Sequence, residues 1–265
     1  MKTPRLSLLA ALLAAAVFSP AAMAQDWSFK NVSINYLDWS GKTERHTGTG
    51  PFGQKKDFTF LELEGGMGGK WGDVYGFFDI ENPTNSPVEN TVGKGRRIAT
   101  KVVGRYNLTE AGGVPVQLYG HVYHFEEHGF RDENRVLGLG TTLGKGGYWI
   151  KPFVGLHQED KTGLGAGMNG GMLGWVLGYS FKVGDQSFML TNWHETEFGR
   201  KDKYLTVAKN GGVTTAKKTA QNGAVSLWWH LNPTVTLGAT YRYADQKLGH
   251  GAYQDALIFT AKYNF

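Results

Sequence analysis

The stretch FTFLELEGGMGGKWGDVYGFFD, residues 58–79, puts acidic and aromatic side chains on the same alternate positions of two short runs. The side chains concerned are Phe58, Phe60, Glu62, Glu64, Asp73, Tyr75, Phe77 and Asp79. Alternation of this kind is typical of β-strands, whose successive side chains point to opposite faces. A water-soluble sheet would place the rings in its core and the acids in water. The stretch therefore raises the question of what lies on the face that the rings and acids share.

The N-terminus has the pattern of a secretory signal peptide. Two basic residues precede an apolar run from Leu8 to Phe18, and A-M-A at 22–24 forms a cleavage site. An uncleaved N-terminal anchor helix is the alternative. We expect residues 1–24 to be a cleaved signal peptide and residues 25–265 to form one domain.

The composition indicates an exported all-β protein. The chain has 38 glycines, 8 prolines, 13% aromatic residues and no cysteine, which leaves no disulfide framework and no thiolate metal site. The formal net charge of +5 includes two basic residues of the expected signal peptide, so it gives no reason to expect a nucleic-acid partner. After the signal there is no apolar run long enough for a membrane helix.

Twelve runs of about ten residues alternate between two kinds of side chain, and no run keeps a helical period. The predicted strands cover 27–39, 57–66, 71–80, 96–108, 114–125, 134–143, 148–157, 172–183, 186–197, 219–231, 234–244 and 254–265.

The links between these strands alternate in length. Short Gly-, Asp- or Asn-containing links with tight-turn chemistry lie at 66–70, 109–113, 144–147, 184–185 and 232–233. Longer polar links are expected at 40–56, 81–95, 126–133, 158–171, 198–218 and 245–253. This sorting, together with an even strand count, predicts a twelve-stranded antiparallel transmembrane β-barrel of the bacterial outer membrane with both termini on the periplasmic side.

The alternation also predicts which face meets lipid. In the last strand, Leu257, Phe259, Tyr263 and Phe265 share an apolar face, and Lys262 lies on the other. A charge on the lipid face costs about 2–4 kcal/mol at the bilayer midplane. We therefore expect Lys101 and Arg105 to point into the lumen.

The same register places the rings and acids of residues 58–79 in the lumen, while Leu61, Leu63, Val74 and Phe78 meet lipid. On the strand over 114–125 it places Tyr119 and His121 in the lumen. Base–aromatic stacking contributes about 1–3 kcal/mol per base, and carboxylates accept hydrogen bonds from hydroxyls and amines. The lumen is thus expected to suit a flat, polar, aromatic solute. The alternative is that the rings only pack against one another or against an inward-folded loop.

The motif L-E-x-E, a Gly/Lys-rich turn and W-x-D-x-Y-G-x-x-D resembles the Tsx family of nucleoside-specific outer-membrane channels, which includes the OmpK-type proteins. It falls on Leu61, Glu62, Glu64, Trp71, Asp73, Tyr75, Gly76 and Asp79. L-T-N-W at 190–193 and the terminal Y-N-F at 263–265 are similar to further segments of the family. The resemblance implies a monomeric twelve-stranded barrel that passes nucleosides and deoxynucleosides, and loops that in some members receive phages or colicins. The loops and the glycine run 65–69 depart from the nucleoside-selective members.

Three groups of residues resemble catalytic or metal sites, but a structural role explains each of them better. Glu62 and Glu64 have the spacing of a glycosidase carboxylate pair but can be balanced by lumen cations such as Lys101, Arg105 or Lys151. His121 and His124 belong to a His/Glu-rich segment, yet they face opposite sides of a strand, unlike a metal pair on a helix. Ser226 and His230 share a face at about 13 Å, too far apart for a lipase pair. We expect no enzyme activity, metal or cofactor.

The basic loop 200–218 has two interpretations, a site for lipopolysaccharide phosphates or a phage tip, and a mobile solvated loop.

The sequence thus predicts a passive, nucleoside-selective channel embedded in the lipid bilayer and lipopolysaccharide of the outer membrane. Phe58, Phe60, Tyr75 and Phe77 would stack on bases. Glu62, Glu64, Asp73 and Asp79 would bind ribose and amines, with Lys101 and Arg105 balancing their charge. The alternative is a structural or receptor barrel with an occluded or non-selective lumen, to which phages or colicins dock.

Overall fold

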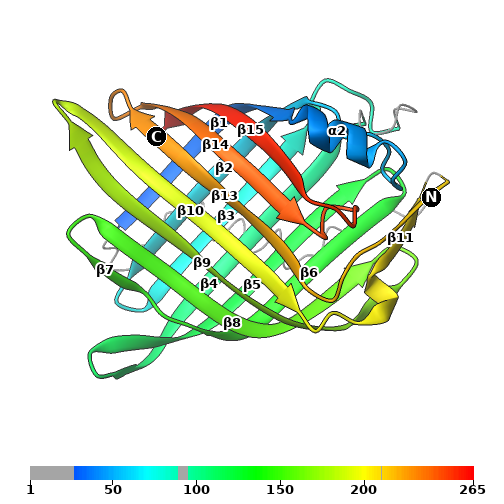
Figure 1. The fold of residues 1–265 in the computed structure, drawn as a ribbon. Helices are drawn as coiled ribbons and strands as arrows, with labels where there is room; N and C mark the ends of the chain where they lie inside the picture. The colour runs from blue at the N-terminus through cyan, green and yellow to red at the C-terminus, as the bar shows by residue number, and fades with distance from the viewer. Residues whose placement is uncertain (1–26, 89–94, 210) are drawn as a thin grey trace.

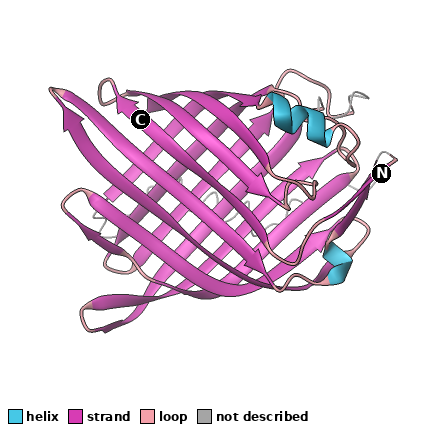
Figure 2. Cartoon of the chain, viewed as in Figure 1, coloured by secondary structure: helices cyan, strands magenta, loops and turns pink. Residues whose placement is uncertain are grey.

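The structure, a computed structural model, describes residues 27–88, 95–209 and 211–265. In this part of the chain, antiparallel strands form a closed β-barrel with twelve strands in its wall (Figure 1). The helical elements in the described ranges are short and lie outside the wall (Figure 2). The predicted fold is therefore confirmed. The expected signal peptide, residues 1–24, lies outside the described residues.

The wall strands are β1 (Trp27–Trp39), β2 (Phe58–Gly69), β3 (Gly72–Glu81), β4 (Arg97–Ala111), β5 (Val114–Glu127), β6 (Phe130–Gly140), β7 (Leu143–Lys145), β8 (Tyr148–Lys161), β9 (Gly165–Val183), β10 (Gln186–Phe198), β13 (Ala220–His230), β14 (Val235–Asp245) and β15 (Gln254–Asn264). β6 and β7 are two parts of one wall strand, since both pair with β8. Outside the wall lie α2 (Gly41–Thr47), the 3-10 helix η1 (Asp202–Tyr204) and the hairpin of β11 (Thr206–Lys209) and β12 (Gly212–Thr215). None of the helices in the described ranges has the length and apolar character needed to cross a bilayer.

The barrel closes between its first and last strands. β1 pairs with β15 from Asn31 opposite Asn264 to Trp39 opposite Ala256, and the Phe265 backbone N–H donates to the Lys30 carbonyl at 3.1 Å. Closure satisfies the backbone groups of every wall strand, as a hydrocarbon environment requires. The C-terminus and the start of β1 therefore share one end of the barrel, at the left in Figure 1.

The two ends differ in their connections. The end that holds the C-terminus, called here the turn end, carries the five short turns. The opposite loop end carries α2, η1 and the β11–β12 hairpin (Figure 1). Two links that were expected to be long, 126–133 and 158–171, are instead tight turns at 128–129 and 162–164. Their polar residues belong to strand ends, where both faces are polar and the alternation that marks a strand disappears.

α2 is an element that the sequence did not indicate. A seven-residue helix is too short to show a helical period, but its start carries a local signal. Ser40 is the N-cap and its Oγ accepts from the Thr43 N–H at 3.1 Å. The same hydroxyl donates to Asp255 Oδ1 at 2.5 Å, which fastens α2 to the start of β15.

The predicted lipid face is confirmed by exposure. On β15, Leu257, Phe259 and Tyr263 are 46%, 51% and 55% exposed, whereas Ala256 and Thr260 are buried. Near the turn end, outward rings stack in a belt across neighbouring strands, as expected at a membrane interface. The belt contains Tyr179, Phe181, Phe188 and Trp229.

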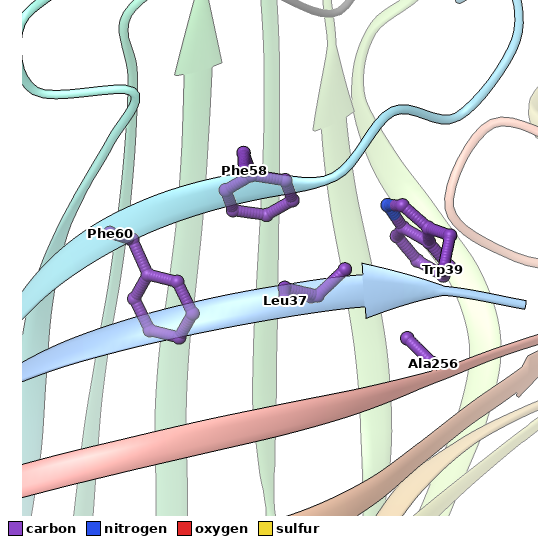
Figure 3. Packing of buried hydrophobic residues seen from close by; sticks show 5 residues of the cluster. All are labelled: Leu37, Trp39, Phe58, Phe60 and Ala256. Carbon is purple, nitrogen blue, oxygen red and sulfur yellow. The ribbon is translucent and has the colours of Figure 1, made fainter.

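The interior of the barrel is partly filled. Leu37 and Trp39 of β1, Phe58 and Phe60 of β2 and Ala256 of β15 form a buried cluster (Figure 3). The cluster lies toward the loop end, because β1 ends at Trp39 and β2 begins at Phe58. Side chains there narrow the passage that the backbone alone would leave open.

Candidate functional site

The lumen of the barrel forms a cavity of about 1410 Å³. All twelve side chains predicted to face the solute line it, from four adjacent strands. They are Phe58, Phe60, Glu62 and Glu64 of β2, Asp73, Tyr75, Phe77 and Asp79 of β3, Lys101 and Arg105 of β4, and Tyr119 and His121 of β5. Their placement follows from the alternation of each strand and from the register of β2 to β5.

Glu62 and Asp79 are direct neighbours across β2 and β3. The Ser33 hydroxyl lies 3.5 Å from Glu62 Oε1, and no donor in the described part of the chain hydrogen-bonds to the buried Asp79 Oδ1. Two further oxygens of lumen-lining residues, Asn31 Oδ1 on β1 and Asn222 Oδ1 on β13, are also buried and have no donor among the residues that the structure describes. Carboxyl oxygens accept hydrogen bonds, so the Glu62–Asp79 pair is suited to a solute that brings hydrogen-bond donors.

Glu64 is held more tightly than Glu62. It accepts hydrogen bonds from Asn31 Nδ2 at 3.0 Å, from the Tyr75 hydroxyl at 2.8 Å and from Lys262 Nζ at 2.6 Å. Its oxygens are therefore occupied by the protein, which leaves Glu62 and Asp79 as the acids best placed to meet a solute.

Asp73 lies between two cations nearer the turn end. Arg105 Nη1 donates to Asp73 Oδ1 at 3.1 Å and Lys151 Nζ donates to Asp73 Oδ2 at 2.9 Å. Asp73 and Arg105 are almost fully buried. Arg105 thus balances one of the four acids, as expected, and Lys151 shares that task.

Lys101 pairs with an acid that the sequence did not single out. Its ammonium group forms an ion pair with Glu195 of β10, not with the acids of β2 and β3. His121 Nδ1 lies 4.0 Å from Glu195 and is hydrogen-bonded to the Tyr119 hydroxyl at 2.7 Å. The inward alternation of Trp193, Glu195 and Glu197 on β10 is the signal that could have revealed Glu195.

The lumen rings differ in how much of their faces is free. Tyr119 is 1% exposed and stacks on Phe153 with ring centroids 4.0 Å apart, so its face is covered. Phe58 and Phe60 belong to the cluster of Figure 3, and Arg97 lies 4.6 Å from the Phe58 ring centroid. Tyr75 and Phe77, whose centroids are 6.4 Å apart at a steep angle, are less buried. We infer that these two rings offer a solute the larger accessible faces.

Tryptophans with cations beside them extend the lining beyond the predicted set. Lys262 lies 4.1 Å from the Trp228 ring, Lys151 lies 4.8 Å from Trp27, and Arg242 lies 4.9 Å from Trp193, each measured to a ring centroid. Cations at this distance are attracted to the ring face. The lumen therefore combines acids, cations and π-faces around its whole circumference.

The β11–β12 hairpin lies over the cavity at the loop end. Lys209 of β11 pairs with Glu127 of β5, and its Nζ lies 5.0 and 5.3 Å from the Phe52 and Phe130 rings. Those two rings meet edge to face at 4.9 Å. The basic loop 200–218 is thus built partly into the mouth, although Lys218 and its partner Asp202 remain exposed.

His250 is part of the same mouth. A Cβ at Gly50 would meet the His250 ring at 1.9 Å, so the ring occupies the place that a side chain at Gly50 would take. His250 Nε2 is buried without a hydrogen-bond partner among the described residues. Burial, and then the nearby charge of Lys55, lower the pKa of His250 to about 4.

We expect the loop around His250, residues 247–252, to lose stability at acidic pH. An imidazole of the unfolded chain titrates near 6.5, so the packed loop keeps its full stability above that pH and loses up to about 3 kcal/mol as pH falls toward 4. Hydrogen exchange at 247–252, corrected for its intrinsic pH dependence, should rise over this window. H250Q should remove the dependence, while H46Q, at an exposed histidine of α2, should retain it. An unchanged pH profile in H250Q would show that another group controls the loop.

The histidines and the serine considered as catalytic or metal-binding groups are separated. His121 faces the lumen and His124 faces outward, as predicted. No cluster of three or more metal-ligating side chains occurs within the described ranges. Ser226 Oγ accepts a hydrogen bond from Thr240, and His230 Nδ1 is hydrogen-bonded to Thr236. Ser226 and His230 therefore have different hydrogen-bond partners and do not pair with each other.

Solved structures similar in fold are β-barrels of distant sequence. The translocator domain of the autotransporter NalP from Neisseria meningitidis is 12% identical, with 97% of this chain and 94% of that chain covered and a TM-score of 0.42. The outer membrane channel DcaP of Acinetobacter baumannii is 11% identical, with 90% and 96% covered and a TM-score of 0.28. Salmonella typhi OmpF, solved with daunomycin, is 8% identical, with 91% and 97% covered and a TM-score of 0.35.

A family comparison covers nearly all of the described chain. The family described as "Nucleoside-specific channel-forming protein, Tsx" matches residues 34–265, which include every wall strand from within β1 to the C-terminus. All twelve predicted lumen residues fall inside the match. The chain therefore belongs to the Tsx family of channel-forming proteins of the Gram-negative outer membrane.

Proposed function

We propose that this barrel passes nucleosides passively and selectively across the outer membrane. The observation that carries the proposal is the combination, in one cavity of about 1410 Å³, of the less buried rings of Tyr75 and Phe77 with the facing carboxyl groups of Glu62 and Asp79. A nucleoside offers the complement, since its base has π-faces and its ribose and amino groups are donors. A sugar of equal size has the donors but lacks the flat base.

Each part of the lining has a role in this proposal. Tyr75 and Phe77 stack on the base, with Phe58 and Phe60 nearer the loop end. Glu62 and Asp79 accept hydrogen bonds from ribose hydroxyls or base amines. Lys101, Arg105 and Lys262 offset the charge of Glu195, Asp73 and Glu64. In this proposal the solute is not chemically changed, and it moves down its own gradient.

Liposome swelling tests selectivity directly. Because stacking contributes about 1–3 kcal/mol per base, adenosine and thymidine at low concentration should enter reconstituted vesicles about tenfold faster than a sugar of equal size. Nucleoside flux should also saturate, since binding sites in the lumen fill. Equal, unsaturable rates for all three solutes would reject nucleoside selectivity while leaving a general channel.

The hairpin over the mouth favours a second candidate, a receptor or structural barrel that conducts poorly. Lys209, Glu127, Phe52 and Phe130 form a contact across the cavity entrance. If no solute enters the vesicles through the wild-type barrel, this second function accounts for the structure better than transport does.

A further inference from the structure

A charged network lies on the outside of the barrel wall near the loop end. It occupies the outward positions of β5, β6 and β8, since the residues that alternate with it line the lumen. Its members are His124, Glu126, Arg131, Glu133, Arg135, Gln158 and Asp160. Charges on an outward wall are costly in hydrocarbon, so their position requires a reason.

Five members of the network form one chain of contacts along the wall. Arg135 forms an ion pair with Glu133 and donates from Nη1 to Gln158 Oε1 at 3.0 Å. Glu133 lies 3.3 Å from His124 Nδ1, and Glu126 lies 3.5 Å from His124 Nε2.

A second ion pair lies closer to the hairpin tips. Arg131 Nη2 lies 2.8 Å from Asp160 Oδ2. The acids therefore hold both guanidinium groups in fixed orientations against the wall.

The level of the network matches the edge of the hydrocarbon. Directly toward the turn end, the same strands expose Leu137, Leu139, Val154 and Leu156, and Tyr148 ends the apolar band. From Tyr148 to Gln158 the strand advances ten residues, about 33 Å along its length and about 23 Å along a barrel axis at 45°. The apolar band of such barrels is about 25 Å tall, so the network begins where lipid headgroups begin.

The cations of the network reach farther out than most of its acids. The side chains of Arg131 and Arg135 are 43% and 41% exposed, while those of Glu133 and Asp160 are 4% and 19% exposed. Glu126, at 42%, is an exposed acid nearer the hairpin tip. A ligand approaching from the lipid side at the level of Arg135 therefore meets guanidinium edges.

The outward groups on the opposite side of the described wall are of a different kind. Near the loop end of β1, β14 and β15, the outward groups are tyrosines and acids: Tyr36 bonds to Asp57, and Tyr241 to Tyr253 and Asp255. The exposed cations on that side, Lys42 and Arg45, belong to α2 and not to these strands.

We propose that Arg131 and Arg135 form a docking site for a phosphate of lipid A, the anchor of lipopolysaccharide in the outer leaflet. Guanidinium groups match phosphate oxygens with paired donors, and the acyl chains of the lipid would cover Leu137, Leu139, Val154 and Leu156. The flanking acids position the guanidinium groups without covering them. The solute lumen and the lipid site share no residue, so this site does not depend on which solute passes.

The test uses the full barrel, purified free of lipopolysaccharide in a neutral detergent. Binding of bisphosphorylated lipid A and of dephosphorylated lipid A is measured by native mass spectrometry. Each arginine near an anionic lipid contributes about 1 kcal/mol, so R131Q/R135Q should bind lipid A about tenfold to thirtyfold more weakly. The control K201Q/K218Q removes two exposed charges from the loop 200–218 and should bind like the wild type.

Four outcomes of these measurements on the wild type, R131Q/R135Q and K201Q/K218Q would overturn the proposal. They are unchanged affinity in R131Q/R135Q, equal affinity of the wild type for both lipids, a loss confined to K201Q/K218Q, and a wild-type dimer that R131Q/R135Q dissolves. The last would identify the network as an interface between two copies of this chain. If the double variant does not fold, the wild-type comparison of the two lipids still decides whether phosphate is recognised. R131K/R135K, which keeps charge but not the paired donors, then decides whether the arginines recognise it; wild-type affinity there would also overturn the proposal.

Discussion

E62Q/D79N is expected to lower the saturable flux of adenosine and thymidine about tenfold, with little change in the flux of a sugar of equal size. The two carboxyl groups face each other across β2 and β3 and offer four acceptor oxygens. The two amides keep the shape but offer two acceptors and add donors. Losing one or two hydrogen bonds of about 1 kcal/mol each gives the expected reduction. Single-vesicle or liposome-swelling rates over a range of nucleoside concentrations measure it.

A matched control separates charge from position. E110Q/D185N makes the same chemical changes at exposed positions of the turn end and should leave both fluxes unchanged. E64Q is a second comparison, because Glu64 is already bonded to Asn31, Tyr75 and Lys262. If E62Q/D79N slows sugar and nucleoside alike, the pair shapes the pore and does not recognise the solute.

The fold could be predicted because a barrel in a bilayer imposes two simple rules on its sequence. Each wall strand must alternate, and a bacterial single-chain barrel has an even number of antiparallel strands with short turns at one end. The last strand shows this plainly, since its apolar half is exposed and its other half is buried. Alternation does not identify the strands at 126–133 and 158–171, because they continue beyond the lipid there and both of their faces carry polar residues.

The direction of each lumen side chain was predictable, but its partner was not. Alternation assigns Lys101 to the inside, yet its partner Glu195 is 94 residues away on another part of the wall. Lys262 and Glu64 are 198 residues apart and meet only because β15 closes on β1. Tyr119 was predicted to face the solute and does line the cavity, but Phe153 covers its ring. Such pairings depend on the curvature of the wall, which a strand's own sequence does not contain.

D73A is expected to cause a large loss of barrel stability. D73A would leave Arg105 and Lys151, both largely buried, without the carboxylate that each contacts. Breaking a buried ion pair by removing one partner costs about 3–5 kcal/mol, because the remaining charge is uncompensated. Urea unfolding of the barrel in detergent micelles, followed by tryptophan fluorescence, should show a loss of this size. The lumen of the surviving barrels should also gain preference for chloride over potassium, since the net charge of this group rises from about +1 to about +2.

A second substitution, K151M, distinguishes an uncompensated buried charge in D73A from a general packing defect. If uncompensated charge causes the loss of stability in D73A, D73A/K151M should be more stable than D73A. The second change removes one of the two unpaired charges, and the methionine side chain still fills the space. K151M alone should cost less than D73A, since Asp73 keeps Arg105 at 3.1 Å. If D73A/K151M is less stable than D73A by the full cost of K151M, the two residues act independently, and uncompensated charge is not the cause of the loss in D73A.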